Sequence, residues 1–198
     1  MTARASTLSL MDVLLPRATL VQNILLIFSG SLLVALCAQI SFYLPFSPVP
    51  VTGQTFALLL VGATFGARRA AAALLLYLAQ GAIGLPVFAP GGLPGLARFA
   101  GPTAGYLLAY PLAAFLLGWL TERLPRRAWL LAVLAAEAVI FAGGVSWLKM
   151  WAQLTWPQAV AQGLLPFLPG GLLKVMLVGA CLPASWWALE KRRPTRER

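Results

Sequence analysis

The sequence contains no histidine and only five acidic residues. The missing histidine removes the most common general base and metal ligand, and it makes a Ser-His-Asp arrangement impossible. The Gly-x-x-x-x-Gly-Lys-[Ser/Thr] loop that cradles nucleotide phosphates is also missing. The cysteines, Cys37 and Cys181, lie far apart in apolar segments, which indicates neither a disulfide framework nor a metal site. We therefore expect no enzyme activity, no metal and no cofactor in this chain.

Apolar residues dominate what is present. They make up 60% of the 198 residues, against roughly 45–50% in soluble domains, and charged residues make up only 10%. The mean hydropathy is +0.84. A chain of this length cannot enclose so much apolar surface in one aqueous core. Because lipid offers the backbone no hydrogen-bond partners, we predict an all-α integral membrane protein.

Six apolar segments approach the length of about 20 residues that a spanning helix needs, and we assign all of residues 1–198 to one membrane domain. The predicted spans are residues 22–44, 51–67, 70–88, 101–120, 128–148 and 171–189. The second is the shortest, so the distribution of basic residues serves as an independent test. Six spans place 12 basic residues on the side of the termini and 2 on the other side, whereas five spans give 10 against 4.

The excess of basic residues therefore indicates topology. A net charge of +10 would suggest nucleic acid binding in a soluble protein, but here the basic residues flank apolar segments. The positive-inside rule predicts a multi-pass protein of the cytoplasmic membrane with both termini in the cytoplasm. Residues 190–198 form a basic cytoplasmic tail that is expected to contact anionic membrane lipid, and no nucleic acid partner is expected.

The outer connections differ from the short, basic cytoplasmic loops. Residues 44–53, 89–100 and 149–170 are nearly uncharged and rich in Pro and Gly. Because Pro fixes φ and removes a donor, we expect these loops to be stiff and non-helical. They are suited to cover a pocket at the outer face. The alternative is an interfacial position, with Trp151 and Trp156 in an aromatic belt.

Two ionisable side chains lie inside predicted spans, where charge is costly unless it is paired or hydrated. Lys174 is predicted about one turn into the last helix, so its ammonium and the helix N-terminus could together hold an anionic carboxylate from the outer side. The alternative is a lysine that reaches out to the headgroups. Glu137 lies deep in the fifth span and could bind a proton, a ligand or a basic partner. The alternatives are a structural ion pair and a protonated, hydrogen-bonded carboxyl.

Further candidate binding residues lie in the outer loops. Arg98 is the second outer cation, with a solvent-exposed loop charge as the alternative. Tyr106 offers an apolar face and a hydroxyl. Thr52, Gln54 and Thr55 offer neutral donors and acceptors, and capping of the second helix is the alternative role.

Three segments carry a family resemblance: residues 48–55 (PVPVTGQT), 101–106 (GPTAGY) and 166–174 (PFLPGGLLK). With these motifs in this order, the chain resembles the BioY family over about residues 20–188. The members of that family are biotin-specific substrate-capture subunits (S components) of energy-coupling-factor (ECF) vitamin transporters. The resemblance implies six helices and a biotin site near the outer face, below the first and third outer loops.

The resemblance also implies roles for residues and partners. Lys174 would help to hold biotin, and Arg98 lies near the position of a family arginine close to the ligand. Family members often carry an acid at the position of Gly171, so this chain departs from the pattern there. Partners would be a transmembrane coupling subunit and two cytoplasmic ATPases that use ATP. S components dock the coupling subunit through small residues of the first helix, which makes Ser31 and Ala35 candidates, with packing inside the bundle as the alternative.

The functional hypothesis is capture of biotin for uptake across the cytoplasmic membrane. Biotin carries a carboxylate, a ureido group and an apolar fused ring, which call for a cation, neutral donors and acceptors, and apolar walls. Which residue meets which ligand group stays open. The alternatives are an S component for another small vitamin and a self-sufficient small-solute permease.

Overall fold

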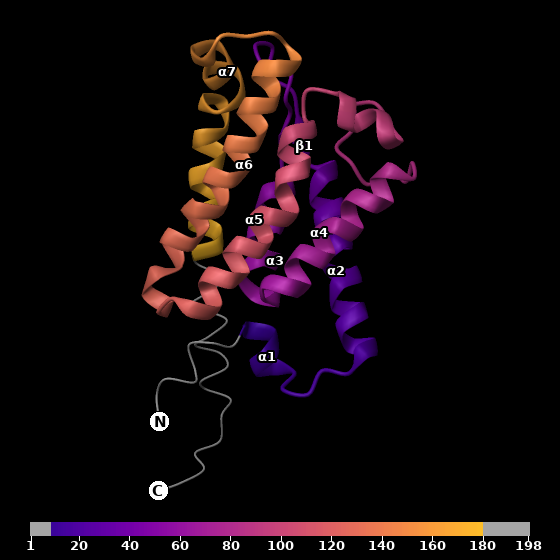
Figure 1. Cartoon of the computed structure of the whole chain (residues 1–198), viewed down its shortest axis with the longest axis vertical. Coiled ribbons are helices and arrows are strands. Elements are labelled where there is room, and N and C mark those ends of the chain that lie inside the picture. Colours follow the sequence, from indigo (N-terminus) through magenta and orange to yellow (C-terminus); the bar gives the residue numbers. More distant parts are fainter. Residues whose placement is uncertain (1–8, 180–198) are drawn as a thin grey trace, which may run out of the picture.

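The computed structural model describes residues 9–179, and this part of the chain is mostly helical (Figure 1). The first half contains α1 (Leu10–Leu14), α2 (Leu20–Gln39), β1 (Ser41–Phe42), β2 (Val51–Thr52), α3 (Gln54–Phe65) and α4 (Ala67–Ala82). The second half contains η2 (Gly95–Ala100), α5 (Ala104–Arg123), η3 (Arg126–Ala128), α6 (Trp129–Trp151), α7 (Trp156–Gly163) and η4 (Leu165–Phe167). A last helix follows at residues 168–179.

Four helical stretches of the described part are long and apolar enough to cross a membrane: α2, α5, α6 and Trp156–Gly179. The apolar helix α3 is shorter. Large apolar side chains cover the outside of α2, where Leu25 is 61% exposed and Leu36 is 60% exposed. Such a surface is stable in lipid and not in water. The expectation of a mostly helical membrane protein is therefore confirmed.

The helix of the first predicted span, α2, ends earlier than predicted. α2 begins at a capping box between Thr19 and Gln22, and it ends at Gln39 instead of residue 44. The chain then forms β1, which pairs antiparallel with β2. Three prolines between the strands cannot continue a helix. This two-stranded ribbon corrects the all-α expectation.

The helices α3 and α4, which correspond to the second and third predicted spans, meet at a tight turn. Gly66 has φ +84°, a conformation that favours glycine. Glu122 of α5 accepts a hydrogen bond from the backbone N–H of Ala67 at 2.8 Å, so a carboxylate lies at the N-terminus of α4. α4 therefore begins three residues before the predicted third span. With 12 residues, α3 is only roughly 18 Å long.

The expectation that the outer loops are non-helical is wrong for two of them. α7 and η4 lie within residues 149–170, and η2 lies within residues 89–100. Pro occupies the first turn of both α7 and η4, where a missing N–H removes no helical hydrogen bond. Thr155 and Gln158 also form a capping box at the start of α7. Pro therefore starts these helices and does not prevent them.

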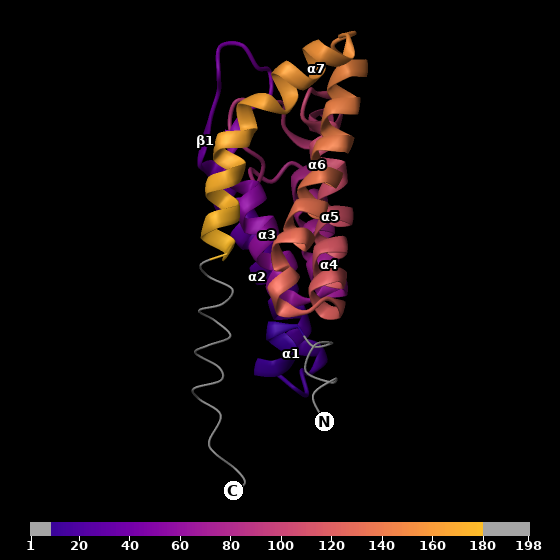
Figure 2. The same cartoon turned by 90° about the vertical axis from the view of Figure 1, so that its left-hand side faces the viewer.

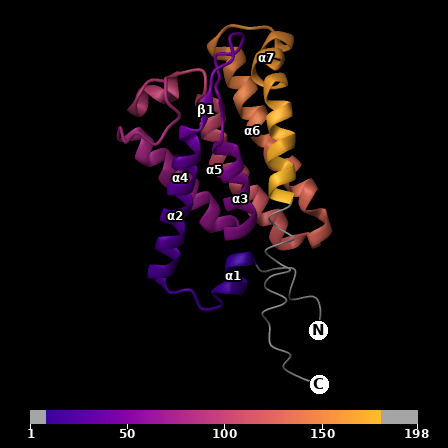
Figure 3. The same ribbon diagram turned by 180° about the vertical axis from the view of Figure 1, so that it is seen from behind.

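Most helices run along one bundle. α7 and the β1–β2 segment lie at one end, while α1 and residue 179 lie toward the other (Figures 1 and 2). Seen from behind, the helix at residues 168–179 descends from α7 in yellow (Figure 3). Small residues allow close packing in lipid. A Cβ on Gly118 of α5, for example, would lie 2.5 Å from the backbone nitrogen of Ala67.

α1 is fastened to the bundle by polar contacts. Asp12 forms an ion pair with Arg69 of α4 at 2.6 Å, and its carboxylate also accepts hydrogen bonds from Ser9. Burial favours a higher pKa for the Asp12 carboxyl, but the hydrogen bonds from Ser9 and Arg69 and the Arg69 charge outweigh it and lower that pKa. The ionised carboxyl therefore contributes to holding α1 in place.

Candidate ligand-binding site

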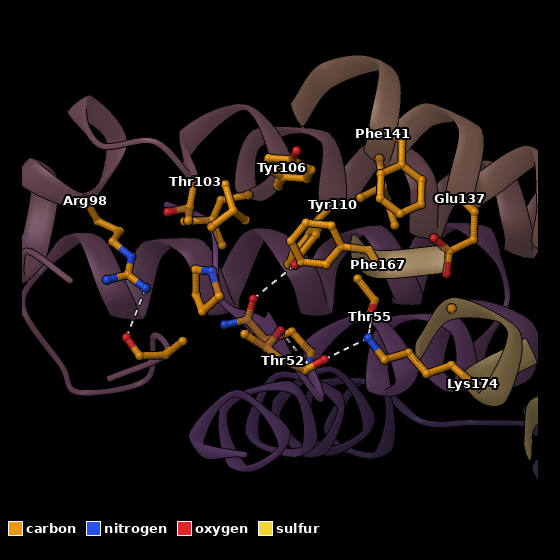
Figure 4. A pocket seen from close by; sticks show the side chains of 17 residues that line it. Thr52, Thr55, Arg98, Thr103, Tyr106, Tyr110, Glu137, Phe141, Phe167 and Lys174 are labelled. Carbon is orange, nitrogen blue, oxygen red and sulfur yellow. Dashed lines mark hydrogen bonds between the residues drawn. The ribbon is translucent and has the colours of Figure 1, made fainter. Parts of the chain in front are cut away.

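A cavity lined by 17 residues borders the end of β2 and the η4 turn that follows α7 (Figure 4). The start of α3, the start of α5, the middle of α6 and the last helix form its walls. The space between its lining atoms, including the part that opens outward, is about 600 Å³. All six binding residues predicted from the sequence line it: Thr52, Gln54, Thr55, Arg98, Tyr106 and Lys174.

Lys174 is turned into this cavity. Its Nζ donates to the backbone oxygen of Thr52 at 2.8 Å and to Thr55 Oγ1 at 2.6 Å. The alternative of a lysine that reaches to the headgroups is therefore wrong. The last helix begins at residue 168, so Lys174 lies about two turns inside it and not one turn.

Two tyrosine hydroxyls fix Gln54 in the lining of the cavity. It is buried, its Nε2 donates to the Tyr77 hydroxyl at 3.0 Å, and its Oε1 accepts from the Tyr110 hydroxyl at 3.0 Å. The N-cap of α3 is Gly53, with no side-chain cap hydrogen bond, and Thr52 Oγ1 accepts from the Gln54 N–H at 3.3 Å. An amide has two donor hydrogens and two acceptor lone pairs, so Gln54 retains one of each for a ligand.

Two glycines leave the space that the Tyr106 side chain occupies. A Cβ on Gly144 of α6 would lie 2.1 Å from the Tyr106 ring, and a Cβ on Gly163 would lie 2.5 Å from its hydroxyl. The hydroxyl donates to the Gly163 carbonyl at 2.7 Å. The Phe167 ring lies 6.3 Å from the Tyr106 ring, centroid to centroid. Tyr106 therefore ties α5 to α7 and presents a fixed aromatic wall.

Arg98 lies at the opposite end of the cavity from Lys174 (Figure 4). It belongs to η2 and is only 5% exposed, so the alternative of a solvent-exposed loop charge is wrong. Its Nη2 donates to the Ala89 carbonyl at 2.9 Å. Its buried Nε has no hydrogen-bond partner among the residues that the structure describes. Gly92 makes room for the guanidinium, because a Cβ there would collide with Nη1.

Glu137 of α6 also lines the cavity. It is 9% exposed, and its Oε1 is buried with no hydrogen-bond partner in the described part of the chain. The ion pairs found there are Asp12–Arg69 and Glu122–Arg123, neither of which includes Glu137. A structural ion pair, one of the alternative roles for Glu137, is therefore not formed within residues 9–179.

The cavity also contains aromatic residues that the sequence reasoning missed. Tyr110, Phe141 and Phe167 line it. Tyr110 follows Tyr106 by four residues, so the two lie on one helix face, and this spacing could have identified it. Phe167 lies within the segment 166–174 that carries the family resemblance.

Ser31 and Ala35, the predicted docking residues, lie inside the bundle. Ser31 is fully buried and Ala35 is 6% exposed. The Ser31 hydroxyl donates to Oε1 of Gln80 in α4 at 2.6 Å. In this chain their side chains take part in the packing of α2 inside the bundle, which was the alternative role given for them. The exposed side of α2 is the one that carries Leu25 and Leu36.

Metal chemistry has no visible basis in the described region. Among residues 9–179 there is no group of three or more acidic, cysteine or histidine side chains close enough to hold a metal ion. The polar side chains of the cavity are instead two cations, one acid, one amide and several neutral hydroxyls. An apolar helical bundle that encloses such a cavity defines a membrane-embedded protein able to bind a small polar molecule.

Comparison with known proteins identifies the family. The sequence model of the BioY family matches residues 5–191, so the chain belongs to the BioY family. A biotin transporter BioY of Rhizobium etli is 37% identical over 158 residues, which cover 75% of this chain and 83% of that protein. A biotin transporter BioY of Thermotoga maritima is 36% identical, over 76% of this chain and 88% of that protein.

A solved structure supports the same relationship. The crystal structure of the S component for biotin from an ECF-type ABC transporter superimposes with a TM-score of 0.72 at 25% identity. The match covers 80% of this chain and 87% of that one.

Proposed function

We propose that this chain is the biotin-binding S component of an ECF transporter and serves biotin uptake across the cytoplasmic membrane. The observation that carries the proposal is that six binding residues, selected from separate segments of the sequence, line one cavity in the bundle. The family relationship gives the ligand its identity, since the relatives described above are biotin transporters.

The cavity matches the chemistry of biotin. Arg98 supplies positive charge for a carboxylate, while Lys174 and Gln54 supply hydrogen-bond donors, and Gln54 an acceptor, for the ureido group. Tyr106 and Phe167 supply flat apolar walls for the fused ring and the aliphatic chain. This mixture of apolar walls and a few placed polar groups is typical of small-molecule sites.

The proposed topology has six spans, with α3 and α4 as the second and third, and both termini in the cytoplasm. The turns α3–α4 and α5–α6 lie at the α1 end (Figure 1). These turns carry Arg68, Arg69, Arg123 and Arg127. An excess of basic residues marks the cytoplasmic side. The cavity is then nearer the outer face.

Transport by this chain needs partners. Because the sequence lacks a phosphate-binding loop, energy from ATP would come from two cytoplasmic ATPases through a transmembrane coupling subunit. Neither metal nor cofactor is required for capture of the ligand. The lipid-facing side of α2 is the surface of this helix that remains free for a membrane partner.

Equilibrium binding of tritiated biotin to the purified protein tests the proposal. We expect saturable binding below the micromolar range that desthiobiotin displaces and that riboflavin and thiamine leave unchanged. Displacement by riboflavin or thiamine would identify an S component for another vitamin, and no saturable binding would refute the proposal. Biotin uptake into proteoliposomes that contain this chain alone would instead indicate a self-sufficient permease.

A further inference from the structure

We infer that Glu137 is a ligand-binding residue: its carboxyl accepts a hydrogen bond from a ureido N–H of the bound molecule. The inference rests on the proposed function and assigns a partner to one group of the ligand. The first observation is the position of the side chain, because Glu137 lines the cavity halfway along α6 and is more than nine-tenths buried. Figure 4 shows its carboxyl pointing toward the cavity and away from the helix axis.

The second observation is that Glu137 Oε1 is buried without a hydrogen-bond partner in the described chain. A buried acceptor that is left unpaired costs free energy, and such groups in native proteins are rare. The carboxyls of Asp12 and Glu122 are, by contrast, both satisfied by hydrogen bonds. Because the free oxygen of Glu137 lies in the lining of a cavity, a bound molecule can supply the missing donor.

The third observation is the hydrogen-bond inventory of Lys174, which lines the same cavity. An ammonium has three donor hydrogens, and two of them are used by the Thr52 oxygen and Thr55 Oγ1. One donor therefore remains. The free acceptor oxygen of Glu137 and the free donor hydrogen of Lys174 together match a ligand group that carries both N–H and C=O, as a cyclic urea does.

Charge favours the same ligand group. When it is ionised, the Glu137 carboxyl repels a second carboxylate, so the negative group of the ligand is then disfavoured beside it. A urea is neutral and donates N–H, which makes it the compatible part of biotin for this position. Charge-assisted hydrogen bonds of this type are short and strong, so the contact contributes to selectivity.

The test compares biotin with its two mono-N-methyl derivatives, in each of which one ureido N–H is replaced by N–CH3. On the wild-type protein, at least one derivative is expected to bind about tenfold or more weakly than biotin. Glu137→Ala is expected to weaken biotin binding by about tenfold or more. It should also remove the difference in affinity between biotin and its N-methyl derivatives, because the alanine side chain neither accepts a hydrogen bond from the N–H nor obstructs the methyl group. Glu122→Gln, which changes an acid outside the cavity, is the matched control and should retain both properties.

A second measurement avoids dependence on the folding of a variant. Infrared difference spectra of the wild-type protein with carbon-13-labelled glutamate should show a carboxyl band that shifts when biotin is added. An unshifted band overturns the inference, as does a Glu137→Ala protein with unchanged biotin affinity or unchanged discrimination. Both results leave biotin binding by the wild type intact, whereas a wild type that binds no biotin refutes the proposed function itself.

Discussion

Removal of the Lys174 ammonium should weaken biotin binding strongly. The substitution Lys174→Met keeps most of the aliphatic chain and deletes only the charged donor group. In the structure this group lies inside the cavity with one donor hydrogen free, after the contacts of 2.8 Å to the Thr52 oxygen and 2.6 Å to Thr55 Oγ1.

The magnitude follows from the type of contact. A hydrogen bond to a charged group contributes about 1.5–3 kcal/mol, which corresponds to a loss of affinity of roughly tenfold to more than hundredfold. A part of the loss could come from the loosened β2–α3 segment, since Lys174 also holds that segment. Thr55→Val separates the two effects, because it removes one tether and leaves the ammonium in place. Its affinity is expected to fall by less than that of Lys174→Met.

Isothermal titration of biotin into the purified proteins measures these differences. Lys149→Met is the matched control, because Lys149 lies over the Trp156 ring at 5.3 Å and does not line the cavity. We expect wild-type affinity for this control. An unchanged affinity of Lys174→Met would show that the ammonium makes no contact with the ligand, and equal losses in Lys174→Met and Thr55→Val would assign the effect to the tether alone.

Two predictions concern stability. Gly144→Ala should lower the melting temperature and weaken biotin binding, because the added Cβ would lie 2.1 Å from the Tyr106 ring and overpacking costs about 1–3 kcal/mol. Gly171→Ala is the control and should not lower the melting temperature, since its Cβ meets no atom within 4 Å. Equal melting temperatures of the two variants would contradict the steric argument. The lowered pKa of Asp12 means that its ion pair with Arg69 stabilises the fold above about pH 4, near the unfolded pKa, and that this contribution disappears as the pH falls through the folded pKa. Melting curves of the wild type and of Asp12→Asn should therefore differ at neutral pH and converge in acid, and a difference that grows in acid would refute this sign.

The sequence allowed the long helices to be predicted, because lipid requires every backbone polar group to be paired within its own segment. α5 and α6 follow the apolar segments to within a few residues. The helical parts of the outer loops were not predicted, since the same proline either breaks a helix or begins one, depending on its position in the turn. That position is set by contacts such as the hydrogen bond from Tyr106 to Gly163, which the local sequence does not contain.

The residues that line the cavity could be predicted from the sequence, but their arrangement around it could not. Lys174 was recognisable as a costly charge inside an apolar span and Arg98 as the second cation of the outer side, and both line the cavity. That they lie at its opposite ends depends on the packing of η2 and the last helix. The unpaired oxygen of Glu137 was likewise not predictable, because it reflects which side chains fail to reach it.

The pairing of Gln54 with Tyr77 and Tyr110 has a consequence for how a captured molecule can leave. Below this amide α3 continues into close-packed side chains, with Leu58, Val61 and their neighbours fully buried. These side chains leave no open space along the buried face of α3 below the amide. A molecule held beside Gln54 therefore moves along α3 toward the α1 end only when these contacts separate, or it is carried when the whole body turns over.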